Sequence, residues 1–193
     1  MSTAMMKTRN AWSVGLMCAL VAGGVVSCAS SSFEKGIYTD PELGYSIPDP
    51  NAHGEAAGPR WSRTSIKGTD LAYRGPDHAF LALSSHCDED ESRPNVLGRK
   101  LLVGLKNRKI ISNEVFEFAD GQAFRQSVES KDEDGDVIFT RTVTLVREGC
   151  VVDWMLVENR AMPEVGSSFD RWWRAFMPGE MPKPSSDLAE VTP

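Results

Sequence analysis

Residues 121–158 read GQAFRQSVESKDEDGDVIFTRTVTLVREGCVVDWMLVE, and this stretch decides the fold. The run 137–146 is dense in β-branched residues, which favour β-strands. Asp134-Gly135 precedes this run and Glu148-Gly149 follows it. Such pairs are typical of two-residue hairpin turns, because the central residues of those turns need positive φ. The stretch therefore predicts three antiparallel strands joined by two tight turns.

Side chains alternate between the two faces of a strand, so the register predicts which residues lie together. If both turns hold two central residues, one face collects large apolar side chains. They are Phe124, Val143, Leu145, Val152, Trp154 and Leu156. The other face brings Arg125 and Asp153 to either side of Thr144. Because a buried aspartate needs a partner, we interpret Arg125 and Asp153 as a structural ion pair, with a catalytic Asp153 as the alternative.

An aromatic helix follows these strands and offers a cover for the apolar face. Four rings recur at positions i, i+3, i+4 and i+7, which is the spacing of one helical face. They are Phe169, Trp172, Trp173 and Phe176. Ser167 or Ser168 is expected to cap the helix, and Pro178-Gly179 to end it. We interpret these rings, with Trp154, as core between helix and sheet. The alternative is that they line a ligand pocket.

The rest of the chain predicts more strands and a second helix. Strands are expected at 45–47, 61–66, 70–74, 78–84 and 110–119. Leucines at helical spacing follow Pro94 and predict the helix, whose last turn would carry three basic residues. The leucines are Leu97, Leu101, Leu102 and Leu105, and the basic residues are Lys106, Arg108 and Lys109. This order predicts an α+β fold, a mostly antiparallel sheet with two helices packed on it.

The first 27 residues have the pattern of an export signal. Lys7 and Arg9 precede an apolar run at 11–26 that is short for a membrane span. The run ends in Val25-Val26-Ser27-Cys28, which resembles the lipobox of bacterial lipoproteins. The resemblance implies cleavage before Cys28, a diacylglyceryl thioether on its sulfur and usually N-acylation, so that palmitate-type chains anchor the protein. An ordinary signal peptide with an incidental Cys28 is the alternative.

The same resemblance implies a location in the bacterial cell envelope. The residue after the cysteine is Ala29, not the aspartate that retains enteric lipoproteins in the inner membrane. We therefore expect an anchor in the outer membrane, with the protein facing the periplasm. Composition divides the remaining chain into a flexible tether at 28–40, one domain at 41–178 and a Pro/Ser-rich disordered tail at 179–193.

A second resemblance covers most of the expected domain. The strand Tyr45-Ser46-Ile47-Pro48, the later Trp61 and the closing aromatic helix at 169–176 are similar to the PsbP-like α/β/α fold. The resemblance implies a sheet between helices. Members of that fold mostly bind or scaffold and are rarely enzymes, and no functional residue carries over from them.

Two cysteines of the expected domain are candidates for a disulfide. Cys87 follows one predicted strand and Cys150 opens another. An oxidising periplasm favours disulfides, and closing a loop of about sixty residues would stabilise the fold by roughly 4 kcal/mol. The strand register decides whether the two Cα atoms are close enough, and two unpaired thiols are the alternative.

Charge and motifs argue against several classes of protein. The net charge of −6 becomes −8 when Lys7 and Arg9 leave with the signal, which argues against nucleic-acid binding. The histidines lack metal-ligand spacing, and the aspartates near Gly135 lack the pattern of a calcium loop. These residues are His53, His78, His86, Asp132, Asp134 and Asp136. The sequence has no nucleophile elbow, P-loop or dinucleotide fingerprint, so we expect no metal, cofactor or catalytic residue.

These expectations favour a function without catalysis. The leading hypothesis is a lipid-anchored accessory or assembly factor that acts through contacts with an envelope protein. The alternative is a carrier of a lipid or other hydrophobic ligand held between the aromatic helix and the sheet. A hydrolase using Asp153 is a third and weaker hypothesis. The sequence does not identify the partner or the ligand.

Overall fold

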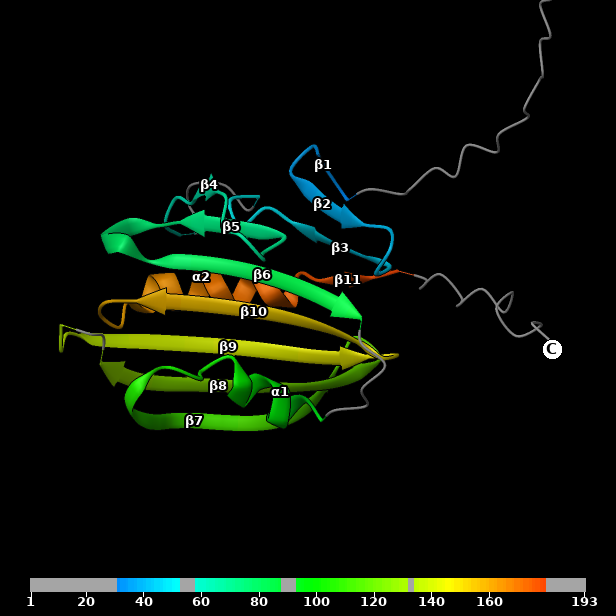
Figure 1. Ribbon diagram of the computed structural model, residues 1–193. Helices are drawn as coiled ribbons and strands as arrows, with labels where there is room; N and C mark the ends of the chain where they lie inside the picture. The colour runs from blue at the N-terminus through cyan, green and yellow to red at the C-terminus, as the bar shows by residue number, and fades with distance from the viewer. Residues whose placement is uncertain (1–30, 53–57, 88–92, 132–133, 180–193) are drawn as a thin grey trace, which may run out of the picture.

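A large antiparallel sheet with a helix on each side dominates the molecule (Figure 1). Seven strands form it in the order β4-β5-β6-β10-β9-β8-β7. The predicted α+β class, with a mostly antiparallel sheet and two helices, is confirmed. The predicted export signal, Cys28 and most of the predicted tail lie outside the described residues. The computed structural model describes residues 31–52, 58–87, 93–131 and 134–179.

Four long consecutive strands form the meander at one end of the sheet. They are β7 (Lys106–Phe118), β8 (Gly121–Lys131), β9 (Val137–Arg147) and β10 (Cys150–Glu158). Ala119-Asp120 joins β7 to β8, Glu148-Gly149 joins β9 to β10, and all four turn residues have positive φ. This is the turn geometry whose twist matches that of the strands. The predicted turn at Glu148-Gly149 is confirmed.

The last strand of the meander pairs with the earlier part of the chain. β6 (Phe80–Cys87) runs along β10 over its whole length. β5 (Leu71–Arg74) and β4 (Ser62–Thr64) continue the sheet beyond β6, and the short 3-10 turn η2 (Pro76–His78) joins β5 to β6. β4 and β7 are therefore the two edge strands. With about 4.8 Å between neighbouring strands, they lie roughly 29 Å apart.

The predicted aromatic helix covers one face of this sheet. α2 spans Pro163–Arg174, and its rings pack against the face that carries Val143, Leu145 and Trp154. It begins before the expected serine caps, because Pro163 suits the first helical position, where no backbone N–H is needed. It ends at Arg174, ahead of Pro178-Gly179.

The second helix is shorter than predicted and lies on the opposite face. α1 spans Pro94–Lys100, and the segment with Lys106, Arg108 and Lys109, expected in its last turn, belongs to strand β7. Gly98 brings α1 close to the sheet, because a Cβ there would lie 2.7 Å from the Phe124 ring. With 7 residues in α1 and 12 in α2, neither helix of the described chain approaches the roughly 20 apolar residues of a membrane span.

A small second sheet closes the core beside α2. Its strands, in spatial order, are β1 (Ser32–Glu34), β2 (Ile37–Asp40), β3 (Tyr45–Pro48) and β11 (Met177–Pro178). Tyr38, Tyr45 and Ile47 are buried in the same core as the α2 rings. The predicted tether at 28–40 is therefore wrong for residues 32–40, which form the hairpin of β1 and β2 around Lys35-Gly36.

The register of β8 corrects the predicted distribution of side chains. Lys131 pairs with Val137, so five residues separate the paired ends of β8 and β9, and the partner of Phe124 is Thr144. The expected two-residue turn would have shifted this register by one position, and a one-residue shift exchanges the faces of a strand. Ala123, not Phe124, therefore joins Leu145 and Val152 under α2, and Phe124 packs against α1.

Candidate functional site

The five aromatic residues singled out from the sequence lie in the core. Trp172 is 1% exposed and Trp173 3%, and Trp154, Phe169 and Phe176 are also buried. Trp172 donates its indole N–H to the Pro48 carbonyl at 3.0 Å and meets the Tyr73 ring edge-on. Trp154 meets the Phe176 ring in the same way at 5.3 Å. These rings fill the space between α2 and the two sheets, as the core interpretation predicted.

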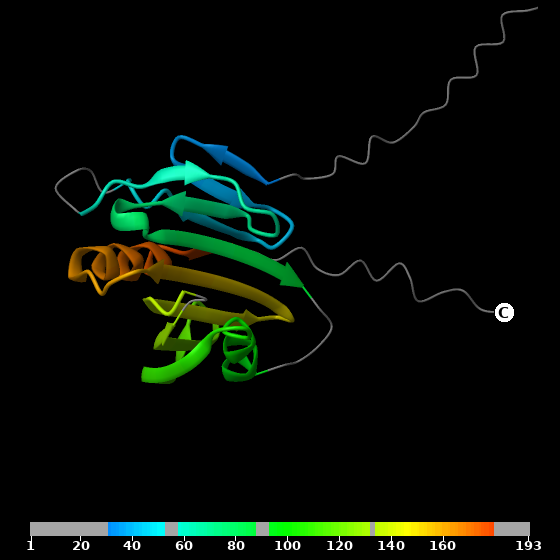
Figure 2. The ribbon, with the colours of Figure 1, turned by 60° about the vertical axis from the view of Figure 1, so that its left-hand side comes forward.

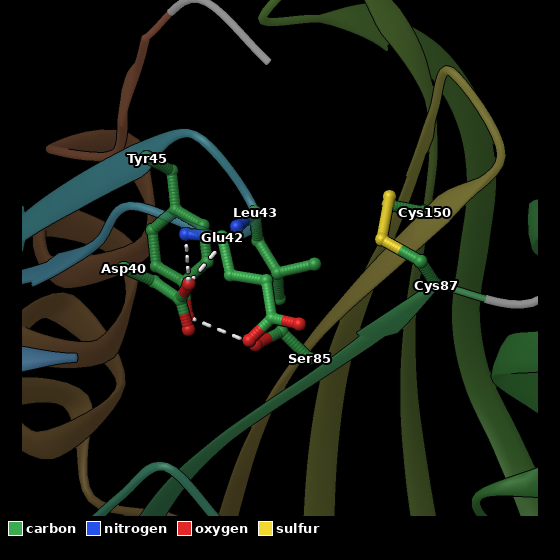
Figure 3. Close-up of a disulfide and its surroundings, with 7 residues drawn as sticks. All are labelled: Asp40, Glu42, Leu43, Tyr45, Ser85, Cys87 and Cys150. Carbon is green, nitrogen blue, oxygen red and sulfur yellow. Dashed lines mark hydrogen bonds between the residues drawn. A yellow bond between two sulfur atoms is a disulfide. The ribbon is translucent and has the colours of Figure 1, made fainter. Parts of the chain in front are cut away.

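The predicted disulfide is confirmed. Cys87 ends β6 directly opposite Cys150 at the start of β10, and an S–S bond of 1.96 Å joins them (Figure 3). Their Cα atoms are 4.0 Å apart, well inside the reach of a disulfide. The bond links β6, which lies outside the meander, to β10, the last strand of the meander.

A polar network lies beside this disulfide. The Tyr45 hydroxyl lies 3.0 Å from the Ser85 hydroxyl, which donates to Asp70 at 2.6 Å (Figure 3 shows the Tyr45–Ser85 contact). Burial raises the pKa of both Tyr45 and Asp70. The Asp40 carboxylate accepts the backbone N–H groups of Glu42 and Leu43 and fixes the loop between β2 and β3. Asp40 and Asp70 also line a hollow of about 690 Å³ that is open to solvent. Among the described residues, no three His, Cys, Asp or Glu side chains gather as metal ligands would.

The predicted ion pair between Arg125 and Asp153 is wrong. Arg125 lies on the α2 side of β8 and pairs with Glu114 of the neighbouring strand β7. Asp153 lies on the α1 side, where it accepts the Thr144 hydroxyl at 2.6 Å. Burial raises the pKa of Asp153, and the bond from Thr144 opposes that rise. The one-residue shift of β8 accounts for the separation, because it turns Arg125 away from Thr144.

An ion pair that the sequence did not indicate lies near the start of α2, between a buried carboxylate and a partly exposed arginine. Glu158 is fully buried, and Arg141 approaches its carboxylate at 3.5 Å. Burial raises the pKa of Glu158, and the Arg141 charge opposes the rise. Gly166 in α2 makes room for the guanidinium, because a Cβ there would lie 2.2 Å from Arg141 Nη1. This pair joins β9, β10 and α2 and has a structural role.

Exposed apolar side chains gather on the segment from α1 to β7. Nine large apolar residues of the described chain are exposed, and five of them lie between residues 96 and 115. Val103 is 78% exposed, Ile110 57% and Val115 53%. We call these five the β7 patch: Val96, Val103, Ile110, Ile111 and Val115. Exposed apolar residues that gather in one region mark interaction sites more often than scattered ones do.

A basic hollow adjoins this patch between α1 and strands β7 and β8. The hollow has a volume of about 650 Å³ and is open to solvent. Its floor is aliphatic, with Leu102 and Val128, and its cationic residues are Arg99, Lys100 and Arg108. We call it the α1 hollow. Residues 93–113 hold six Lys or Arg residues and no acid in a chain of net charge −6, so this region is locally positive.

A second hollow lies on the other face of β7, toward α2. It has a volume of about 480 Å³, and the rings of Phe116, Phe118 and Trp173 line it. The Phe118 ring lies 5.2 Å from the Trp173 ring, and the Arg174 guanidinium stacks over Trp173 at 4.8 Å. We call it the aromatic hollow. β7 is thus an edge strand with an open hollow on each face.

Sequence reasoning missed this edge. A helix expected to run to Lys109 concealed the first part of β7, and the edge position of a strand depends on pairing that local sequence does not state. One signal was available, the run of six cations without an acid in an otherwise acidic chain. The helix dipole accounts for Arg99 and Lys100 in the last turn of α1, but not for Lys106, Arg108 and Lys109, which lie in β7.

Solved structures match the chain at the level of the fold. No protein-family model and no curated protein matches it. The chain is similar to the solution structure of cyanobacterial PsbP (CyanoP) from Synechocystis sp. PCC 6803, with a TM-score of 0.53 and 18% identity over 82% of this chain and 98% of that chain. The fold is PsbP-like. The resemblance found in Tyr45-Ser46-Ile47-Pro48, Trp61 and the aromatic helix is confirmed to that extent.

Two further solved structures match the chain with TM-scores below 0.5. One is a protein of unknown function from Pseudomonas aeruginosa, described as a putative regulator, with a TM-score of 0.46 and 15% identity over 77% of this chain and 97% of that chain. The other is a protein from Bacteroides thetaiotaomicron, with a TM-score of 0.48 and 8% identity over 75% of this chain and 48% of that chain.

Proposed function

We propose that this protein is a lipid-anchored accessory or assembly factor of the bacterial envelope that works through protein contacts and not through catalysis. Cys28 carries the lipid, and the anchor lies in the outer membrane facing the periplasm. The observation that supports the contact role is the β7 patch with its basic border, an exposed apolar surface on a molecule whose core is otherwise well filled.

The filled core favours this role over that of a carrier. A carrier built from the aromatic helix and the sheet needs space between them for its ligand. Trp172 is buried against the protein's own side chains. The space beside Trp173 is the aromatic hollow, which lies at the sheet edge and is open to solvent. The two hollows at the β7 edge are open to solvent, which suits a protein better than a small apolar molecule.

The anchor and the β7 patch lie toward opposite ends of the molecule under this proposal. Only residues 29–31 separate Cys28 from β1, and four steps of about 3.5 Å reach at most roughly 14 Å. β1 lies at the end of the molecule away from β7 in both views (Figures 1 and 2). A domain held this closely at β1 presents β7 away from its own membrane.

The anchor is tested with the full chain expressed in a bacterial envelope and fed an alkyne analogue of palmitate. Wild type is expected to take up the label and to sediment with membranes. Cys28→Ala is expected to lose the label completely and to move to the soluble fraction. An unlabelled wild-type protein, or a Cys28→Ala variant that keeps the label, contradicts the lipid anchor.

The contact role is tested in the same cells by chemical crosslinking and affinity capture of the wild-type chain. A second, unrelated outer-membrane lipoprotein captured in parallel removes nonspecific neighbours. We expect the same envelope protein in every replicate. Replicates that share no protein beyond those of the parallel capture contradict the contact role.

A further inference from the structure

We infer that β7 accepts an extended segment of a partner protein as an eighth strand of the large sheet, and that this segment alternates apolar and acidic residues. The inference rests on the proposed contact role and specifies its site and its chemistry. The site is the stretch of β7 from Ser112 to Phe118. Adding a strand to a free edge is a recurrent mode of peptide recognition, in which backbone bonds give affinity and flanking pockets give specificity.

The hairpin geometry identifies which backbone groups of β7 face outward. The residues that flank a two-residue turn form a hydrogen-bonded pair, here Phe118 and Gly121, and such pairs recur at every second residue of an antiparallel ladder. The inward groups of β7 are therefore those of Ser112, Glu114, Phe116 and Phe118. The outward groups are those of Asn113, Val115 and Glu117, and they are in position to pair with an added strand.

The irregular part of β7 defines the limits of the docking stretch. The register of β7 against β8 shifts between Lys106 and Lys109 and again between Ile110 and Ser112. Irregular pairing and lysines protect an edge strand against unwanted pairing. From Ser112 to Phe118 every residue pairs in turn with β8, so this stretch is a regular free edge of seven residues.

The two hollows lie on opposite faces of β7, the α1 hollow before the docking stretch and the aromatic hollow beside it. Side chains of successive residues point to opposite faces, so a strand beside β7 presents one set toward the α1 hollow and the other toward the aromatic hollow. On β7, Arg108 and Ile110 border the α1 hollow just before the docking stretch, and Phe116 and Phe118 border the aromatic hollow within it. Apolar side chains on the face of the aromatic hollow gain burial against its rings. Acidic side chains on the other face approach the cations of the α1 hollow where the added strand continues past Ser112.

Charge selects the partner. The α1 hollow is lined by Arg99, Lys100 and Arg108 and by no carboxylate, so an occupant with acidic side chains is attracted and one with basic side chains is repelled. A second copy of this chain would bring its own six cations to the same joined edge. The proposed lipid anchor at Cys28 would hold β1 near the membrane, and β7 lies at the end of the molecule away from β1 (Figure 2). An anionic membrane is therefore disfavoured as the occupant. The aromatic hollow carries both signs of charge, with Glu114 and Glu117 beside Arg125 and Arg174, so it does not select an acid. The occupant is therefore a different chain whose acidic side chains lie on the face of the α1 hollow.

The site is tested by photocrosslinking in the envelope. A benzophenone amino acid replaces Val115 in the full-length chain, and the same replacement of Ile66, an exposed apolar residue before β5, is the control. Position 115 is expected to capture one protein through a peptide with apolar and acidic residues at alternate positions, and position 66 is not. Capture of lipid, of this chain itself, or of the same peptide from both positions contradicts the inference.

The backbone contact is tested with the captured segment made as a synthetic peptide. Val115→Pro removes an outward N–H without removing a bond to β8, and Val115→Thr keeps that N–H at the same position. We expect the affinity for the peptide to fall at least tenfold in Val115→Pro and to stay within threefold of wild type in Val115→Thr. Equal affinity in all three proteins contradicts strand addition.

A charge reversal covers the case in which Val115→Pro does not fold. Lys100→Glu leaves the ladder untouched, and it is expected to weaken peptide binding at least fivefold at low salt and less at high salt. Unchanged binding in Lys100→Glu contradicts the acidic partner.

The contact role and the strand inference can be contradicted separately. If crosslinked membranes yield a reproducible partner that position 115 never captures, the strand inference is wrong and the contact role stands, whereas no reproducible partner from any position contradicts both.

Discussion

Asp153 is the buried carboxyl group whose environment is most clearly defined. It lies on the sheet face against which α1 packs, and it accepts the Thr144 hydroxyl. Burial raises its pKa, so the folded chain keeps the proton to a higher pH than the unfolded chain. The stability that this protonation contributes is complete below the ordinary pKa of 3.8 and is lost as the pH rises through the folded-state value.

The substitution Asp153→Asn is expected to stabilise the protein at neutral pH. Asparagine keeps an acceptor for Thr144 and carries no charge, so the variant avoids the cost of burying a carboxylate. We expect its free energy of unfolding to exceed that of wild type by about 1 kcal/mol at pH 7, and the two to converge toward pH 4. Urea unfolding at both pH values measures the difference. A variant that is destabilised equally at pH 4 and pH 7 contradicts this account.

For single residues, the sequence predicted which side chains are buried better than it predicted which face of the sheet they lie on. Trp172 and Trp173 were assigned to the core from helical spacing alone, and they are buried there. Arg125 was assigned to Asp153, and it lies on the other face with Glu114. The difference comes from one residue in the connection after Lys131, because a strand that shifts by one position reverses both faces. No local propensity fixes the length of such a connection.

The disulfide acts at the scale of elements, because it joins the end of β6 to the start of β10. The two cysteines are 63 residues apart, and closing a loop of this size stabilises the folded state by roughly 4 kcal/mol in the chain-entropy model. The double variant Cys87→Ser/Cys150→Ser is expected to lose about that much free energy of unfolding. Urea unfolding of the oxidised wild type and of the variant measures it.

A matched control separates the bond from the serine side chains. Adding reductant to the wild type is expected to reproduce the stability of the double variant, and to leave the double variant unchanged. If oxidised wild type and double variant unfold at the same urea concentration, the cross-link between β6 and β10 contributes nothing to stability.

Elements with strong periodicity were predictable and elements with weak pairing were not. β8, β9, β10 and α2 follow from β-branched density, turn residues and aromatic spacing. The two- to four-residue strands β1, β2 and β11 carry too little local preference to be recognised. β2 and β11 form along the two edges of β3, and β1 forms along β2. The boundary between α1 and β7 was misplaced, since Leu101 and Leu105 continue a helical spacing that tertiary pairing overrides.

At the scale of the whole molecule the chain has two ends with different properties. The β1 hairpin, close in sequence to Cys28, lies at one end, and the edge strand β7 with its basic surroundings lies at the other (Figures 1 and 2). The disulfide and a buried hydrophobic core connect the body between them. A short connection to a lipid at one end would thus fix where the β7 edge is presented.

The central claim is that β7 is a free edge that binds a strand of another protein. Amide hydrogen exchange tests this claim most directly. The measurement follows single amides by NMR, first in the protein alone and then with the captured peptide. We predict that Asn113, Val115 and Glu117 exchange at least tenfold faster than Glu114 and Phe116 in the protein alone, and that the peptide slows those three to the rate of their neighbours. Equal protection of all five amides in the protein alone, or no slowing with the peptide, would contradict the claim.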